Sequence, residues 1–148
     1  MSTAPSPSAP STPIHLWIVG VLAVIWNCIG AGNYVMTQFR VESYMSSFTP
    51  EQLDYYYGFP AWAVAFWALA VWGGVAGSIL ILLRKGVAEI VLLVSLVSMV
   101  INSIYAYGMS NGMEIQGSGG FAFTVLIFLI ALGLWIYARA MRAKGVLA

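Results

Sequence analysis

Four long apolar segments with no charge in their central turns constrain this chain more than any other feature. They run from about residue 14 to 36, 60 to 83, 87 to 107 and 121 to 141. Each is near or above the ~20 residues that an α-helix needs to cross a ~30 Å hydrocarbon core. Helices of a soluble protein need an exposed polar face, and these segments have none. The pattern predicts an all-α bundle of four transmembrane helices.

The overall composition points the same way. Of the 148 residues, 61% are hydrophobic and 7% are charged, whereas soluble domains carry about 25% charged residues. The net charge is +1, and no Lys/Arg cluster suggests a phosphate-tracking surface. We therefore expect the lipid bilayer, and not nucleic acid, as the main partner.

The first thirteen residues differ from the rest of the chain. After the initiator Met they contain only Ser, Thr, Ala and Pro, which predicts a disordered tail over residues 1–13. The tail lacks the basic segment of a signal peptide, and the apolar run after it is too long for one. We expect that run to be retained as the first helix of a transmembrane domain over residues 14–148.

The basic residues predict the orientation. Five of the six Lys and Arg residues fall on one side of the predicted bundle. These topology residues are Arg84, Lys85, Arg139, Arg142 and Lys144. The positive-inside rule places this side in the cytoplasm. Both termini are then expected inside, and the two longer connections outside.

A short helix is predicted in the first outer loop. Thr49 suits the N-cap, Pro50 suits the first helical position, and Glu51 places an acid in the first turn. Tyrosines occupy 55–57 and Gly58 can end the helix. With its tyrosines at headgroup level, such a helix would lie on the membrane surface.

Polar and aromatic side chains gather in the outer halves of the predicted helices. The candidate ligand-binding residues are Trp26, Asn27, Asn33, Tyr34, Trp62, Trp67, Ser98, Asn102 and Tyr105. Amides can hydrogen-bond hydroxyl groups while aromatic rings stack on apolar faces, which suits a neutral polyol, sugar, lipid headgroup or quinone. Alternatively, Asn27, Asn102 and the serines bond one another between helices, which is the commoner use of such residues.

A run of small residues in the second predicted helix favours close helix packing. It consists of Gly73, Gly74, Gly77 and Ser78. Small residues four positions apart, such as Gly73 and Gly77, let two backbones approach. The partner is expected to be a neighbouring helix of the same bundle or, alternatively, a second copy of the chain.

Groups that could carry catalysis or bind a metal are sparse. Cys28 is the only cysteine and His15 the only histidine, so neither an internal disulfide nor bis-histidine haem ligation is available. Glu89 is the one acid within a span, and it suits a first-turn helix acid better than a deep proton relay. The sequence predicts no enzyme, no metal site and no cofactor.

Three blocks of the sequence resemble a known group of proteins. Residues 16–38, 48–78 and 107–117 resemble a family of small, uncharacterised four-span proteins of the bacterial inner membrane, often named sugar transporter by automatic naming. The resemblance implies a solute carrier in the inner membrane and no catalytic residues. Relatives often carry an acid in place of Asn33, so no charge-dependent role is expected at that position.

Two functions of different classes follow as expectations. The first is a carrier or binder for a neutral polar or amphipathic solute. Because four helices are few for a translocation path, such a carrier would be at least a homodimer. The second is a non-catalytic accessory or assembly subunit that docks on a larger membrane complex through the aromatic loop helix.

Overall fold

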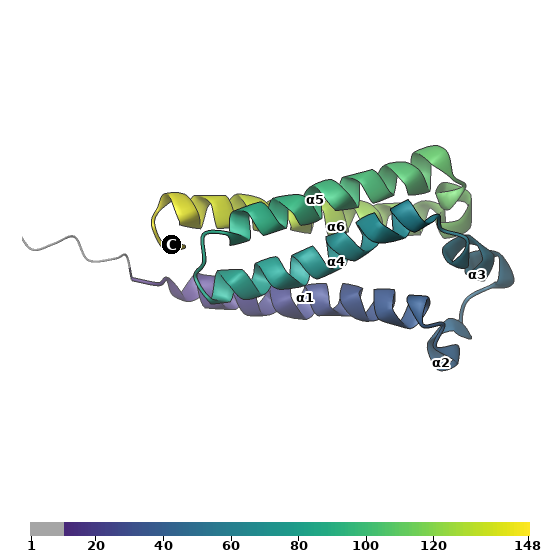
Figure 1. Cartoon of the computed structure of the whole chain (residues 1–148), viewed down its shortest axis with the longest axis horizontal. Coiled ribbons are helices and arrows are strands. Elements are labelled where there is room, and N and C mark those ends of the chain that lie inside the picture. The colour runs from purple at the N-terminus through teal and green to yellow at the C-terminus, as the bar shows by residue number, and fades with distance from the viewer. Residues whose placement is uncertain (1–10) are drawn as a thin grey trace, which may run out of the picture.

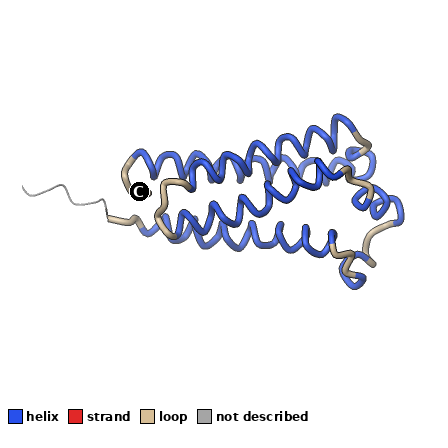
Figure 2. The backbone as a smooth tube through the Cα atoms, in the orientation of Figure 1, coloured by secondary structure: helices blue, strands red, loops and turns tan. Residues whose placement is uncertain are grey.

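The computed structural model describes residues 11–148 (Figure 1). The elements in chain order are α1 (Ile14–Gln38), α2 (Glu42–Met45), α3 (Pro50–Tyr57), α4 (Ala61–Leu82), α5 (Ala88–Ile104), the π-helix η1 (Tyr105–Met109) and α6 (Gly112–Ala143). Residues 11–148 contain no strand (Figure 2). Most of the predicted tail, residues 1–10, lies outside the described residues, and 11–13 lead into α1 without helix.

The predicted all-α four-helix bundle is confirmed. Helices α1, α4, α5 with η1, and α6 are each long and apolar enough to cross a membrane, and they lie side by side along the long axis (Figure 1). The chain is a multi-pass integral membrane protein. The start of α1, the α4–α5 connection and the C-terminus share one end, and α2 and α3 lie at the other (Figure 1). We call these the basic end and the loop end.

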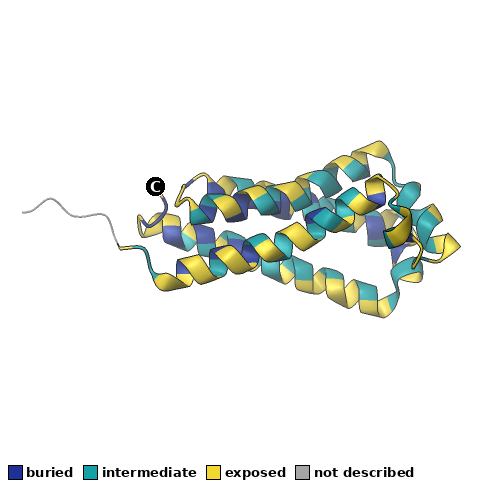
Figure 3. Ribbon diagram, turned by 90° about the horizontal axis from the view of Figure 1, so that it is seen from below, coloured by how far each residue is buried: buried dark blue, intermediate teal, exposed yellow. Residues whose placement is uncertain are grey.

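The exterior of the bundle is the kind of surface that lipid covers. Exposed residues run along all of the long helices (Figure 3). Many of them are large and apolar, including Ile18, Val97 and Leu129, which are 54%, 48% and 55% exposed. In water such a surface would associate, whereas a bilayer satisfies it.

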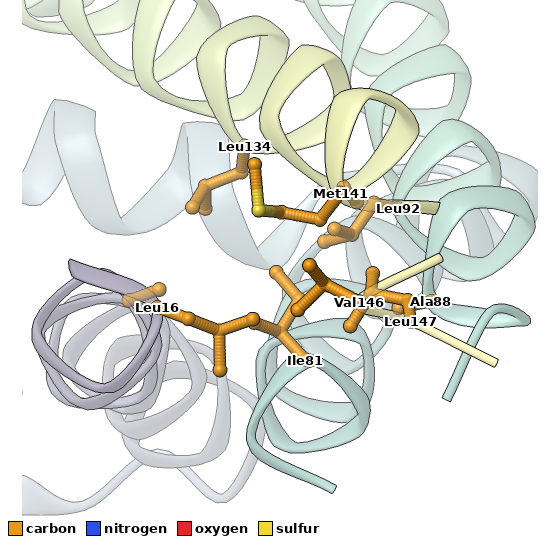
Figure 4. Close-up of a cluster of buried hydrophobic side chains, with 10 residues drawn as sticks. Leu16, Ile81, Ala88, Leu92, Leu134, Met141, Val146 and Leu147 are labelled. Atoms are coloured by element: carbon orange, nitrogen blue, oxygen red, sulfur yellow. The ribbon is translucent and has the colours of Figure 1, made fainter. Parts of the chain in front are cut away.

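Buried hydrophobic side chains form a core cluster toward the basic end (Figure 4). The core cluster there consists of Leu16, Ala23, Ile81, Ala88, Leu92, Leu134, Ala138, Met141, Val146 and Leu147. The last residues fold back to complete it: the Ala148 amide donates to the Arg84 carbonyl (3.0 Å), and the Gly86 amide donates to the Ala148 carbonyl (2.8 Å). The bundle is therefore closed at this end.

Neighbouring helices pack unequally around the bundle. Helix α4 packs closely on both α1 and α5, and α5 packs on α6, but α1 and α6 close the ring only loosely. The predicted small residues explain the close contacts of α4. A Cβ atom on Gly77 would lie 2.5 Å from Leu92 Cδ2, and one on Gly73 would lie 3.1 Å from Ser95 Cβ. This face of α4 is therefore filled by neighbouring helices of the same chain.

Two helix boundaries differ from the predicted ones. The last helix begins at Gly112 and not near residue 121, and it bends at Gly117, where φ is 72° and ψ is −178°. Only glycine adopts this conformation readily. The third span ends in the π-helix η1 instead of stopping at residue 107.

The predicted helix in the first loop is confirmed as α3. The Thr49 hydroxyl accepts from the backbone N–H of Gln52 (3.2 Å), and the side-chain oxygen of Gln52 accepts from the backbone N–H of Thr49 (3.0 Å). This reciprocal capping box fixes where the helix starts. A further turn of helix, α2, precedes it.

Candidate functional site

A cavity of about 700 Å³ occupies the loop-end half of the bundle. All four long helices contribute to its wall, and α2, α3 and the segments that flank α3 contribute to its roof. Leu134 lies at its floor and also belongs to the core cluster. The cavity therefore ends where the dense packing of the basic end begins.

Aromatic and uncharged polar side chains line much of this cavity. The polar residues in its wall are Asn27, Asn33, Thr37, Ser95, Asn102, Ser103, Gln116 and Thr124, with the phenols of Tyr44, Tyr56 and Tyr107. Trp26, Phe48, Phe59, Trp67 and Phe123 supply further aromatic rings. Within residues 11–148 no Asp, Glu, Lys, Arg or His lines the cavity. The site offers hydrogen bonds and ring faces, but no fixed charge.

Asn102 is the residue of this wall that has a buried side-chain atom without a hydrogen-bond partner. Its Oδ1 atom is buried and has no hydrogen-bond partner among residues 11–148. A buried unpaired acceptor costs about 1–3 kcal/mol, and such groups are few in folded proteins. Asn102 lines the cavity, and a rotation of its side chain would bring this oxygen to a hydroxyl group placed there.

Asn27, by contrast, is held between helices. Its Nδ2 group donates to the Ala23 carbonyl (2.8 Å) and to Ser78 Oγ of α4 (3.1 Å). Ser78 donates in turn to the Gly74 carbonyl (2.7 Å). Gly74 leaves room for the Asn27 amide, because a Cβ atom at Gly74 would collide with it. Asn27 lines the cavity and is also a packing residue.

The predicted residues separate into two groups. The cavity wall brings together Trp26, Asn27, Asn33, Trp67 and Asn102. The residues that lie outside this wall are Tyr34, Trp62, Ser98 and Tyr105. Of the first group, Asn33 also accepts a hydrogen bond from Thr37 one turn further along α1 (3.2 Å).

The residues outside the wall have packing environments of their own. Tyr34 packs edge-to-face on Trp67, with ring centroids 5.0 Å apart. Trp62 and Tyr105 pack on each other at 5.2 Å. Ser98 is buried, only 3% exposed. These contacts join neighbouring helices around the cavity.

Several wall residues, Tyr107 and Gln116 among them, were not singled out from the sequence. The Tyr107 hydroxyl lies 3.2 Å from Gln116 Oε1 and 2.8 Å from Thr124 Oγ1, which forms a polar cluster between η1 and α6. Tyr107 takes the place expected for Tyr105 because the π-helix starts at Tyr105 and changes the direction of the side chains that follow. Gln116 was expected in a loop, and no spacing pattern in the sequence identifies it.

The roof of the cavity is aromatic. Tyr44 and Phe48 pack together (5.7 Å), as do Phe48 and Tyr56 (5.8 Å). Tyr55 anchors α3 to the segment after η1, because its hydroxyl lies 3.0 Å from Ser110 Oγ. Burial raises the pKa of the Tyr55 and Tyr56 phenols above their ordinary value. Both are therefore held as neutral groups.

The predicted topology residues gather at the basic end. Arg84 and Lys85 lie in the α4–α5 connection, and Arg139, Arg142 and Lys144 lie in the last turns of α6 or just after it. Arg142 forms an ion pair with Glu89 (3.1 Å), so this acid of the first turn of α5 is neutralised far from the cavity. Arg84 donates to the Thr12 hydroxyl (2.8 Å).

No protein-family model, curated protein or solved structure matches this chain.

Proposed function

We propose that this protein is a carrier or binder for a neutral solute, either polar and sugar-like or amphipathic, and that the central cavity is its binding site. The observation that carries the proposal is the cavity of about 700 Å³ with an aromatic and uncharged polar wall. Its volume lies within the range of about 300–1,000 Å³ typical of ligand sites. The proposal includes no catalytic step.

The chemistry of the wall supports a neutral solute. An ion taken into the membrane interior needs an opposite charge or close polar coordination to offset its desolvation. The wall supplies amides, hydroxyls and phenols, and no charged side chain from residues 11–148. A hydroxyl-bearing molecule matches it better, because a hydroxyl can donate to the oxygens of these groups and accept from their N–H and O–H groups.

The orientation of the site belongs to the same proposal. The positive-inside rule supports a cytoplasmic basic end, in the inner membrane of a bacterium, with α2 and α3 on the outer side. The core cluster closes the basic end. A transport cycle would therefore require that cluster to open, whereas binding alone would not.

Native mass spectrometry of the full-length protein, gently extracted from its own membrane, tests the proposal. We expect a small neutral mass to be retained by the wild type. The Asn102→Leu variant should lose it, because it keeps the side-chain size but removes the amide from the cavity wall. Val100→Leu, a lipid-facing change on the same helix, is the matched control and should retain the mass.

The same spectra address the alternative. A protein that carries no small molecule but is attached to other polypeptides in fixed ratio would overturn the proposal in favour of an accessory subunit. The copy number in the spectra also tests the homodimer expected for a carrier. The Tyr56 ring of α3 supports the binding function, because it lines the cavity and is not presented as a docking surface.

A further inference from the structure

A second cavity lies beside the central one and differs from it in chemistry. It is a cleft of about 460 Å³ between α1 and α6. Its lining is entirely apolar: Val19, Leu22, Ala23, Ile25, Trp26, Ile29, Ile130 and Leu134. Helices α1 and α6 are neighbours that pack only loosely, and the cleft is the space left open between them.

The cleft opens on the surface that faces lipid. Three of its lining residues, Leu22, Ile25 and Ile29, are 61%, 54% and 66% exposed. They belong to the membrane-spanning helix α1. An acyl or isoprenoid chain in the bilayer can therefore reach the cleft without crossing water.

The cleft and the central cavity share a wall. Trp26, Ile29, Ile130 and Leu134 line both. Trp26 also packs on Phe123 of α6, with ring centroids 6.1 Å apart, and Phe123 lines the central cavity only. Trp26 thus stands at the junction between an apolar space that faces lipid and a polar space inside the bundle.

We infer that the ligand is an uncharged amphiphile of lipid-like build, an inference that rests on the proposed function. Its hydroxyl-bearing head occupies the central cavity, and its hydrocarbon chain lies in the cleft between α1 and α6. The head meets the Asn102 amide, whose Oδ1 accepts from it once the side chain rotates toward the cavity, and the cluster of Tyr107 and Thr124. A sugar or polyol without a chain would leave the cleft unused.

Photolabelling tests this assignment on the full-length protein in phosphatidylcholine nanodiscs. The probe is monooleoylglycerol with a photoreactive diazirine in its chain. We expect labelling to concentrate on residues 19–29 of α1 and on Ile130 and Leu134. Unlabelled monooleoylglycerol should displace the probe, and free glycerol should not.

Three variants separate specific binding from ordinary lipid contact. Asn102→Leu should raise the concentration of monooleoylglycerol that halves the labelling by about tenfold, as expected for one lost hydrogen bond to a buried group. Leu22→Trp should fill the cleft and remove the labelling. Leu69→Trp, at an exposed position on α4 away from both cavities, is the control and should leave it unchanged.

The outcomes distinguish failure of this inference from failure of the proposed function. Labelling no stronger in the cleft than on other lipid-facing positions, or unaffected by Asn102→Leu, would overturn the inference. Displacement by glycerol as effective as by monooleoylglycerol would overturn it too, while leaving a cavity that binds polyols. An extracted protein that retains no small molecule would overturn the proposed function itself.

Discussion

Asn27 and Asn102 are both amides within membrane-spanning helices, yet their surroundings differ. Asn27 is bonded to Ser78 of a neighbouring helix, so its polar groups contribute to holding α1 against α4. The Oδ1 atom of Asn102 is buried without a partner among residues 11–148. The first arrangement stabilises the bundle, whereas the second costs stability and is the pattern expected of a binding group.

This difference predicts opposite effects of the same substitution. Asn27→Leu should lower the free energy of unfolding of the ligand-free protein by about 0.5–2 kcal/mol, the scale of an interhelical hydrogen bond. Asn102→Leu should leave it unchanged or raise it by up to about 1–3 kcal/mol, because an unpaired buried group is removed. Unfolding titrations in mixed detergent micelles measure both. Equal losses in the two variants would show that Asn102 is also a packing residue.

The sequence indicates only part of this difference between Asn27 and Asn102. An amide near mid-membrane must face inward, so both asparagines could be predicted to point into the bundle. Whether each finds a partner depends on the relative register of two helices, which brings Ser78 beside Asn27. No local pattern encodes that register, so pairing at Asn27 and its absence at Asn102 required the three-dimensional structure.

Two irregular segments at the loop end shape the polar side of the cavity. The π-helix η1 directs Tyr107 to the cavity wall and leaves Tyr105 packed against Phe59 and Trp62. The bend at Gly117 extends α6 back to Gly112 and thereby places Gln116 in the wall. Hydropathy and periodicity predict the regular spans well, but they assume uniform helical geometry and miss both irregularities.

Gly117→Ala tests the bend in α6. A side chain at φ 72° and ψ −178° is strained, so we expect a loss of about 1–3 kcal/mol of stability and weaker retention of the ligand as Gln116 shifts. Gly119→Ala is the matched control: a Cβ atom there meets nothing within 4 Å, and alanine in a helix should stabilise by about 0.5–1 kcal/mol. Thermal unfolding and native mass spectrometry give the two readouts. If the two variants behave alike, the bend does not position Gln116.

The roof helix α3 should be sensitive to alkaline pH. Because burial raises the pKa of Tyr55 and Tyr56, the folded state favours their neutral phenols. That contribution to stability is fully present below the ordinary tyrosine pKa of about 10 and is lost as pH rises through the raised values. The midpoint of thermal unfolding should therefore fall above pH ~10, and fall less in the double variant Tyr55→Phe/Tyr56→Phe. Identical pH profiles would rule out this linkage.

Across the whole molecule, the core cluster and most of the basic residues lie at the same end. The basic end holds the core cluster and the ion pair between Arg142 and Glu89, whereas the loop end holds the central cavity and its aromatic roof. The sequence predicts that the two ends differ, because its Lys and Arg residues are concentrated at one of them. It does not predict that the basic end is the closed one, because that depends on the folding back of Val146 and Leu147 into the core.

Orientation in the membrane can be tested by moving the charges. Arg84 and Lys85 are replaced with serine, and two lysines are added to the loop that contains α3. These changes remove most of the difference in Lys and Arg residues between the two ends, on which the positive-inside rule depends. We expect a C-terminal reporter, cytoplasmic in the unchanged protein, to become partly or wholly exposed on the other side. Exchanging Arg84 and Lys85 for each other is the control and should preserve the orientation. The polar cavity lies at the loop end. If the C-terminus of the unchanged protein is found outside, the loop end faces the cytoplasm, and the solute would enter the cavity from the cytoplasmic side.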